Sequence, residues 1–212
     1  MAGYLVLGMG FGILLLDAGY GVLWAAGMSL VIYAGSMQYV GVGLISAGAS
    51  LLTAALTTVT VNARHLFYGI SMIERYRDAG REKPYLIFSL TDETYSLLCD
   101  GSLPEGVDPR GYRLLVSLFN HLYWVAGSVI GSLLGEALPF STEGIEFSMT
   151  ALFVASLTEQ WMSTRDHLPA LVGLIEATAC LAVFGPDGFL IPSLLLITLT
   201  LMLVRGRRGE KR

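Results

Sequence analysis

Long apolar stretches alternate with short charged or glycine-rich segments along the chain, and this pattern predicts membrane-spanning helices. A helix needs about 20 apolar residues to cross a bilayer core that is about 30 Å thick. Seven segments fit or approach this requirement: residues 3–16, 21–45, 50–72, 114–134, 145–157, 168–184 and 189–204. We therefore expect an all-α integral membrane protein with roughly seven transmembrane or partly spanning helices.

Two of these segments carry similar polar residues at matching places. The shared positions are Ser36, Met37 and Gln38 in the first segment and Ser148, Met149 and Thr150 in the second. Each follows an apolar helix and precedes two further hydrophobic segments, which is typical of transporters built from an inverted repeat with two discontinuous helices. In such transporters the broken helices meet near the midplane and bind substrate, so we expect these six residues to belong to the substrate-binding site. We expect a single transporter domain over residues 1–212 with repeat halves 1–110 and 111–204. A chance match of so few residues is the alternative.

Composition agrees with a membrane location. Hydrophobic residues make up 54% and charged residues 14% of the chain, whereas about 25% charged residues is usual for a soluble domain. The net charge of −4 sums loops on both sides of a membrane, so it predicts no nucleic-acid partner. Cys99 and Cys180 lack metal-site spacing and no catalytic motif is present, so we expect no metal, no cofactor and no enzymatic activity.

The Lys and Arg residues predict the orientation, because positively charged loops stay in the cytoplasm. They gather in four connections, at residues 75–83, 110–113, 165 and 205–212, and are absent from residues 135–144 and 185–188. We assign the first group to the cytoplasm and the second to the outside. The expected location is therefore the cell inner (plasma) membrane, with several passes and a cytoplasmic carboxyl terminus.

Residues 85–99 carry Asp92 and Glu93 between Thr91 and Thr94. A lipid-facing span with these charges would cost several kcal/mol, so we expect a re-entrant or amphipathic segment on the cytoplasmic side. The two carboxylates could pair with Arg64, attract the ammonium group of an amino acid, or carry a proton. An exposed amphipathic helix with its charges in water is the alternative.

Asn62, Arg64 and His65 interrupt the apolar character of segment 50–72, and each needs a polar partner. In the functional interpretation Arg64 or Asn62 binds a substrate carboxylate and His65 is a titratable proton site. In the structural interpretation Arg64 extends to the membrane interface, while Asn62 and His65 join helices by hydrogen bonds. Glu176 stands alone in segment 168–184, as a proton site or as the acceptor of an interior hydrogen bond from Thr or Ser.

Two glycine runs predict close helix packing. Gly8 and Gly12 form a GxxxG pair, and Gly127, Gly131 and Gly135 form a longer run of the same spacing. Glycine at every fourth position lets two helix backbones approach closely. We expect packing surfaces, within the chain or against a partner, and no ligand site.

Three motifs resemble the AzlC family of branched-chain amino acid permeases. They are Gly-Ser-Met-Gln-Tyr at residues 35–39, Val-Asn-Ala-Arg-His-Leu-Phe-Tyr-Gly at 61–69, and the segment 83–95 that contains Thr-Asp-Glu-Thr-Tyr. The resemblance implies the large subunit of an exporter of branched-chain and related apolar amino acids. It also implies a partner, a small AzlD-like membrane subunit. The direction of transport rests on the resemblance alone.

Together these observations predict a secondary transporter that works by alternating access and is coupled to protons. Arg64 and Asn62 would meet the substrate carboxylate, Asp92 and Glu93 its ammonium group, and Met37 and Met149 its aliphatic side chain. His65 or a carboxylate would carry the proton. The alternatives are a passive channel for small solutes and a membrane scaffold subunit. Saturable counterflow separates a carrier from a channel, and the loss of activity in an assembled Arg64 variant separates a carrier from a scaffold.

Overall fold

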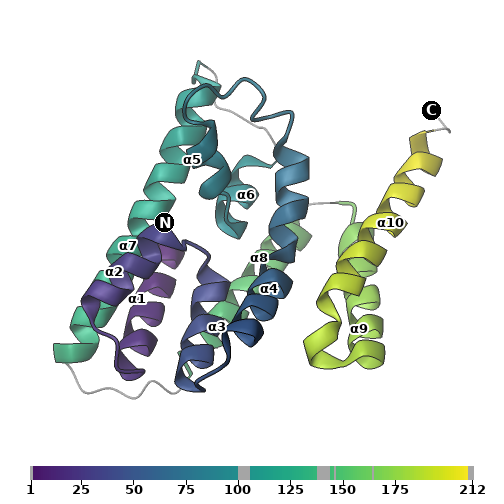
Figure 1. Cartoon of the computed structure of the whole chain (residues 1–212). Coiled ribbons are helices and arrows are strands. Elements are labelled where there is room, and N and C mark those ends of the chain that lie inside the picture. The colour runs from purple at the N-terminus through teal and green to yellow at the C-terminus, as the bar shows by residue number, and fades with distance from the viewer. Residues whose placement is uncertain (1, 100–105, 138–143, 146, 164, 210–212) are drawn as a thin grey trace. The chain divides into compact units, whose positions relative to one another are not determined.

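The computed structural model describes residues 2–99, 106–137, 144–145, 147–163 and 165–209, and the regular secondary structure within these ranges is entirely helical (Figure 1). The chain forms two compact units, Met1–Thr150 and Ala151–Arg212. The first unit contains α1 (Ala2–Asp17), α2 (Val22–Val31), α3 (Gly35–Ser46), α4 (Leu51–Met72), α5 (Lys83–Phe88), α6 (Asp92–Leu98) and α7 (Pro109–Ala137). α8 (Phe147–Ser163) crosses the boundary, and α9 (Leu168–Gly188) and α10 (Leu190–Gly209) complete the second unit.

α1 and α7 pack together through their glycines. A Cβ atom at Gly8 would lie 2.8 Å from the carbonyl oxygen of Trp124, and one at Gly12 or Gly131 would overlap the backbone of the facing helix. The two backbones are therefore in direct contact, as the glycine spacing predicts. The two glycine runs pack on each other within the chain. The expected packing surface is therefore confirmed, and it is used within the chain.

A buried network of hydrogen bonds joins α2, α3 and α7. The indole Nε1–H of Trp124 donates to Oε1 of Gln38 at 2.9 Å, and the amide of Gln38 donates to Ser29 Oγ at 3.3 Å. The hydroxyl of Ser29 donates to Ser128 at 2.7 Å. Because each of these side chains is at most 2% exposed, the bonds fix how the three helices meet.

Two of the connections between helices in the first unit are short breaks of three residues. The first falls between α2 and α3 at residues 32–34, where Tyr33 has a positive φ of 42°. The sequence predicted the discontinuity at Ser36, Met37 and Gln38, but these residues already lie in α3, which begins at Gly35. The second break, at residues 89–91, divides the segment 85–99 into α5 and α6. The side chain of Thr91 caps α6 by accepting from the backbone N–H of Thr94.

The predicted second discontinuity at Ser148, Met149 and Thr150 needs correction. α8 runs without a break from Phe147 to Ser163, so these residues lie in its first turn. Ser36 and Gln38 occupy the first turn of α3 in the same way. A bend within α9 at Gly185, where φ is 71°, precedes Pro186 and falls in the connection predicted for residues 185–188. The inverted repeat and the single domain stay predictions.

Within the described ranges, two helices are long and apolar enough to cross a bilayer, namely Pro109–Ala137 and the Leu168–Pro186 part of α9. Three shorter apolar helices, Gly3–Asp17, Val22–Val31 and Leu190–Val204, lie below the required length. α4 has 22 residues, but its threonines and the Asn62, Arg64 and His65 side chains lower its hydropathy. The membrane class of the sequence prediction is supported, while the number of seven spans stays a prediction.

Candidate functional site

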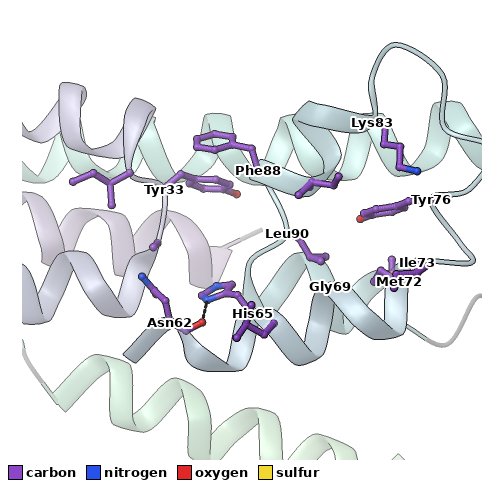
Figure 2. Close-up of a pocket in the computed structure, with 14 residues that line it drawn as sticks. Tyr33, Asn62, His65, Gly69, Met72, Ile73, Tyr76, Lys83, Phe88 and Leu90 are labelled. Carbon is purple, nitrogen blue, oxygen red and sulfur yellow. Dashed lines mark hydrogen bonds between the residues drawn. The ribbon is translucent and has the colours of Figure 1, made fainter. Parts of the chain in front are cut away.

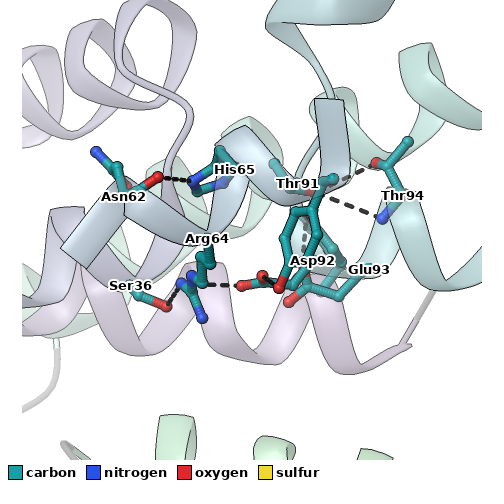
Figure 3. A network of polar contacts seen from close by, with 10 residues as sticks. Ser36, Asn62, Arg64, His65, Thr91, Asp92, Glu93 and Thr94 are labelled. Atoms are coloured by element: carbon teal, nitrogen blue, oxygen red, sulfur yellow. Dashed lines mark hydrogen bonds and ion pairs between the residues drawn. The ribbon is translucent and has the colours of Figure 1, made fainter. Parts of the chain in front are cut away.

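Arg64 lies at the centre of a polar cluster formed by α4 and the first turns of α3 and α6 (Figure 3). Its guanidinium Nη2 donates to the hydroxyl of Ser36 at 2.6 Å. The same nitrogen lies 3.0 Å from a carboxylate oxygen of Asp92. The helix breaks before α3 and α6 therefore place the two partners of Arg64 against α4, and the expected pairing of Arg64 with Asp92 is confirmed.

The second oxygen of Asp92 is held as well. The hydroxyl of Tyr68 donates to it at 2.7 Å, and the Tyr68 ring stacks on Tyr95 with centroids 4.5 Å apart. The side chains of Arg64 and Asp92 are only 18% and 19% exposed. An ion pair that is so largely removed from water is held only when further hydrogen bonds satisfy the remaining polar atoms, and Ser36 and Tyr68 supply such bonds here.

Glu93 points away from its neighbour Asp92. The hydroxyl of Tyr4 on α1 donates to Glu93 Oε2 at 2.9 Å and lies 2.5 Å from Thr91 Oγ1. Thr94 Oγ1 accepts from the Asn120 amide of α7 at 3.1 Å. The two adjacent carboxylates therefore bind different helices: Asp92 pairs with Arg64 on α4, whereas Glu93 accepts a hydrogen bond from Tyr4 on α1.

Asn62 and His65 line a pocket of about 430 Å³ beside this cluster (Figure 2). Its walls are the break at residues 32–34, the second half of α4, α5, and Leu90 in the second break. The His65 Nδ1 atom lies 3.3 Å from the backbone carbonyl of Asn62, and the ring meets Tyr68 edge-on. Most of the lining is aliphatic or aromatic, and the volume is within the range of about 300–1,000 Å³ that small-molecule sites occupy.

The remaining predicted site residues lie elsewhere. Met37 and Gln38 are buried, and Gln38 is engaged by Trp124, so neither lines the pocket. Thr150 is exposed at the start of α8, while the side chains of Ser148 and Met149 are outside the part of the chain that the structure describes. Glu176 belongs to the second unit, where it accepts from Thr200 at 2.7 Å, as one of its two interpretations predicts.

Several residues of the site were given no role by sequence reasoning. Tyr68 follows Arg64 by one helical turn, which signals a shared face. Tyr4 carries no such signal, because it lies in an otherwise apolar helix. His121 on α7 is also new: its Nε2 donates to the backbone carbonyl of Ser29 at 3.2 Å, and its ring stacks on Tyr33 with centroids 4.1 Å apart.

Comparison with known proteins identifies relatives along most of the chain. A family model described as "AzlC protein" matches residues 1–138. The "Branched-chain amino acid transport protein AzlC" of Bacillus subtilis (strain 168) is 43% identical over 204 residues, covering 96% of this chain and 80% of that protein. An "Uncharacterized membrane protein" of Helicobacter pylori (strain ATCC 700392 / 26695) is 44% identical, covering 97% of this chain and 90% of that protein. The "Inner membrane protein YgaZ" of Escherichia coli (strain K12) is 26% identical, covering 86% and 77% respectively. No solved structure matches the chain significantly.

Proposed function

The chain belongs to the AzlC family, and from this premise we propose that it is a secondary transporter subunit that exports branched-chain and related apolar amino acids. The relative from Bacillus subtilis is named for branched-chain amino acid transport. The observation that carries the proposal is the Arg64–Asp92 ion pair beside an apolar pocket, because one cation and one anion match the two charges of an amino acid zwitterion.

The ion pair suits reversible binding. In the empty site each charge neutralises the other, which avoids leaving an isolated charge in a region of low dielectric. A zwitterion that enters between them gives its carboxylate to Arg64 and its ammonium group to Asp92. The total charge of the site does not change, and each charge of the zwitterion exchanges its hydration for a partner of opposite sign. Asn62 provides a further polar contact to the substrate, and Ser36 holds the guanidinium in position.

The apolar pocket accommodates the aliphatic side chain in this proposal. Leu66 on α4, Ile73 directly after α4 and Ile87 on α5 line it, and they take the role that the sequence assigned to Met37 and Met149. Full burial of a branched aliphatic side chain contributes only about 1.5–3 kcal/mol, and one methylene changes this by about 0.8 kcal/mol. We therefore expect loose selectivity among leucine, isoleucine, valine and methionine.

Coupling, partner and orientation complete the proposal. The transported amino acid exchanges against protons, with His65, Glu93 or Glu176 as the proton carrier. The chain works with a small AzlD-like membrane subunit in the inner (plasma) membrane, with its carboxyl terminus in the cytoplasm. The positive charges of residues 75–83 and 205–212 support this orientation.

The glycine runs provide no support for a scaffold subunit without its own transport site. A scaffold interpretation would use these faces to bind a partner. Gly8 and Gly12 instead pack against the backbone of α7, and Gly127 and Gly131 against the backbone of α1. The carrier is therefore the function that the geometry of the first unit supports best.

The proposal is tested by export of preloaded, radiolabelled leucine from cells that express the chain together with its small partner. We expect faster leucine export than in cells without the chain. Arg64→Ala and Asp92→Asn should abolish the increase at unchanged membrane abundance, because each leaves one charge of the zwitterion without a partner. Full export by both variants would reject the assigned binding residues.

Arg77→Ala is the matched control for these variants. Arg77 also forms an ion pair, with Glu74 at 3.4 Å, but both side chains are at least 75% exposed. Such a surface pair contributes little, so export should equal that of the wild type. A wild-type chain without leucine export would reject the proposed function itself.

A further inference from the structure

The pocket is longer than a single amino acid. Asn62 and His65 line one end, and Tyr76 and Lys83 line the other, as Figure 2 shows. Asn62 and Met72, both lining residues, lie ten positions apart on α4, which corresponds to about 15 Å along the helix axis. One residue spans at most about 3.6 Å of backbone, so a single amino acid does not contact both polar ends at once.

The end at Tyr76 offers hydrogen-bond donors. Tyr76 is 3% exposed, and its hydroxyl group is buried without a hydrogen-bond partner among the described residues. A buried hydroxyl without a partner is costly, which favours a ligand that supplies an acceptor. Lys83 is exposed at the start of α5 and forms no ion pair within the described part of the chain. A phenol hydroxyl and an ammonium group that line the same end of a pocket suit a carboxylate.

Apolar side chains separate the two ends. Met72 and Leu90 are buried, and Ile73 and Leu66 also line this stretch of the pocket. A branched aliphatic side chain fits along such walls, while Asn62 and His65 at one end and Tyr76 and Lys83 at the other offer polar partners to a charged head group. The pocket therefore holds two favourable positions for an apolar amino acid, with an apolar passage between them.

We infer that Tyr76 and Lys83 form an outer subsite, which binds the carboxylate of an amino acid before it reaches Arg64. The inference rests on the proposed transport function and adds a second, weaker binding position to it. The subsite lies beside the loop that carries Arg75, Arg77 and Arg81, which belongs to the proposed cytoplasmic side. It raises the local substrate concentration at the mouth of the pocket, so its loss changes the apparent KM and leaves the maximal rate unaltered.

Leucine counterflow in proteoliposomes that contain the full chain and its small partner tests this inference. Lys83→Gln and Tyr76→Phe should each raise the KM for leucine by about threefold to tenfold, as expected for the loss of one bond to a carboxylate, with the maximal rate within about twofold. Inhibition by leucinamide, which lacks the carboxylate, should keep its wild-type inhibition constant. Arg81→Gln is the control, because Arg81 lies in the same loop but does not line the pocket.

The outcomes separate this inference from the function on which it rests. An unchanged KM in both variants, or equal effects on leucine and leucinamide, would reject the outer subsite while transport by the wild type stands. If wild-type chain shows no counterflow, the proposed function fails, and the subsite with it. Lys83→Gln keeps the test valid if Tyr76→Phe fails to fold, since the exposed Lys83 makes no ion pair with the residues described.

Discussion

α7 and α4 occupy the same compact unit but bury different parts of their surfaces. The buried face of α7 consists of Trp124 and small or polar residues, namely Ser117, Asn120, Gly127, Ser128, Gly131 and Ser132. α4 buries only Met72 and leaves residues such as Leu51, at 90% exposed, without cover. α7 is thus fixed by backbone contact and buried hydrogen bonds, whereas α4 meets its neighbours through the polar cluster around Arg64 and the apolar contacts of Met72.

The difference between the two helices suggests that α7 serves the stability of the unit and α4 serves its function. Small residues let helices pack at van der Waals distance where apolar burial alone gives little preference in lipid. A helix that is held by an ion pair and a few hydrogen bonds can exchange those partners for a ligand. We therefore expect substitutions on α7 to alter assembly and substitutions on α4 to alter transport.

The largest effect should come from the glycine contact. Gly131→Leu would drive a side chain into the backbone of α1, and overpacking of this kind costs about 3 kcal/mol or more. We expect the variant to lose its monodisperse peak in fluorescence-detected size-exclusion chromatography. Gly27→Leu is the matched control, because no atom lies within 4 Å of a Cβ at Gly27. Equal behaviour of both variants would contradict the close packing of α1 and α7.

The next effect concerns α4. Arg64→Ala removes the bonds to Ser36 and Asp92, and losing a bond to a charged group costs about 1.5–3 kcal/mol, or tenfold and more in transport. We expect leucine counterflow to fall by at least that factor, with normal chromatographic behaviour. An Arg64 variant that fails to assemble would show that α4 also serves stability and would remove the contrast with α7.

Trp124→Phe tests the buried network of α7. The change leaves Gln38 without the donor that now lies 2.9 Å away, and a buried polar group without its partner costs about 1–2 kcal/mol. The thermal midpoint of the detergent-solubilised protein should fall, while the KM for leucine stays constant. Trp24→Phe, at an exposed position on α2, should leave the midpoint unchanged. A change in KM would instead place Gln38 in the binding site.

Tyr68→Phe should have a smaller effect on α4. It removes one hydrogen bond to Asp92 and keeps the ring that stacks on Tyr95, so we expect a loss of about 1 kcal/mol, or about fivefold in transport. Counterflow kinetics measure this, with Tyr123→Phe on α7 as the control. Wild-type kinetics of Tyr68→Phe would show that the hydroxyl does not position Asp92.

The smallest effect concerns the loop pair Glu82–Arg110, at 2.7 Å. Hydrogen bonding to its own backbone N–H, and then to Arg110, lowers the pKa of Glu82. Its contribution to stability is therefore present above the pKa of the unfolded chain and is lost as the pH falls through the folded pKa. Because the Arg110 side chain is 52% exposed and water weakens the pair, Glu82→Gln should leave the thermal midpoint at neutral pH unchanged. A clear fall would show that this loop stabilises the unit.

Sequence patterns predicted much of the fold. The apolar segments 50–72 and 168–184 correspond to α4 and α9 within a few residues. The glycine spacing predicted close packing, because only the absence of a side chain permits backbone contact. Breaks depend on the local backbone, so the first break lies at Tyr33, which has a positive φ, and precedes the predicted residues. The bend at Gly185 falls in the connection predicted for residues 185–188.

The site was predictable only in part. Charged residues in apolar helices need partners, which pointed to Arg64 and Asp92 before any contact was known. The sequence contains no information of this kind about apolar pocket walls such as Leu66 and Ile87, whose role depends on which helices meet. Gln38, a predicted substrate-binding residue, does not line the pocket, since a buried amide satisfies either a substrate or a neighbouring Trp124.

The central claim is that the Arg64–Asp92 pair binds the amino acid zwitterion. The most direct measurement is the equilibrium binding of radiolabelled leucine to the purified chain with its small partner, for the wild type and Asp92→Asn. We predict saturable binding to the wild type that is reduced at least tenfold in Asp92→Asn, because the ammonium group loses its carboxylate. Equal binding by both proteins, at equal amounts of folded protein, would contradict the account.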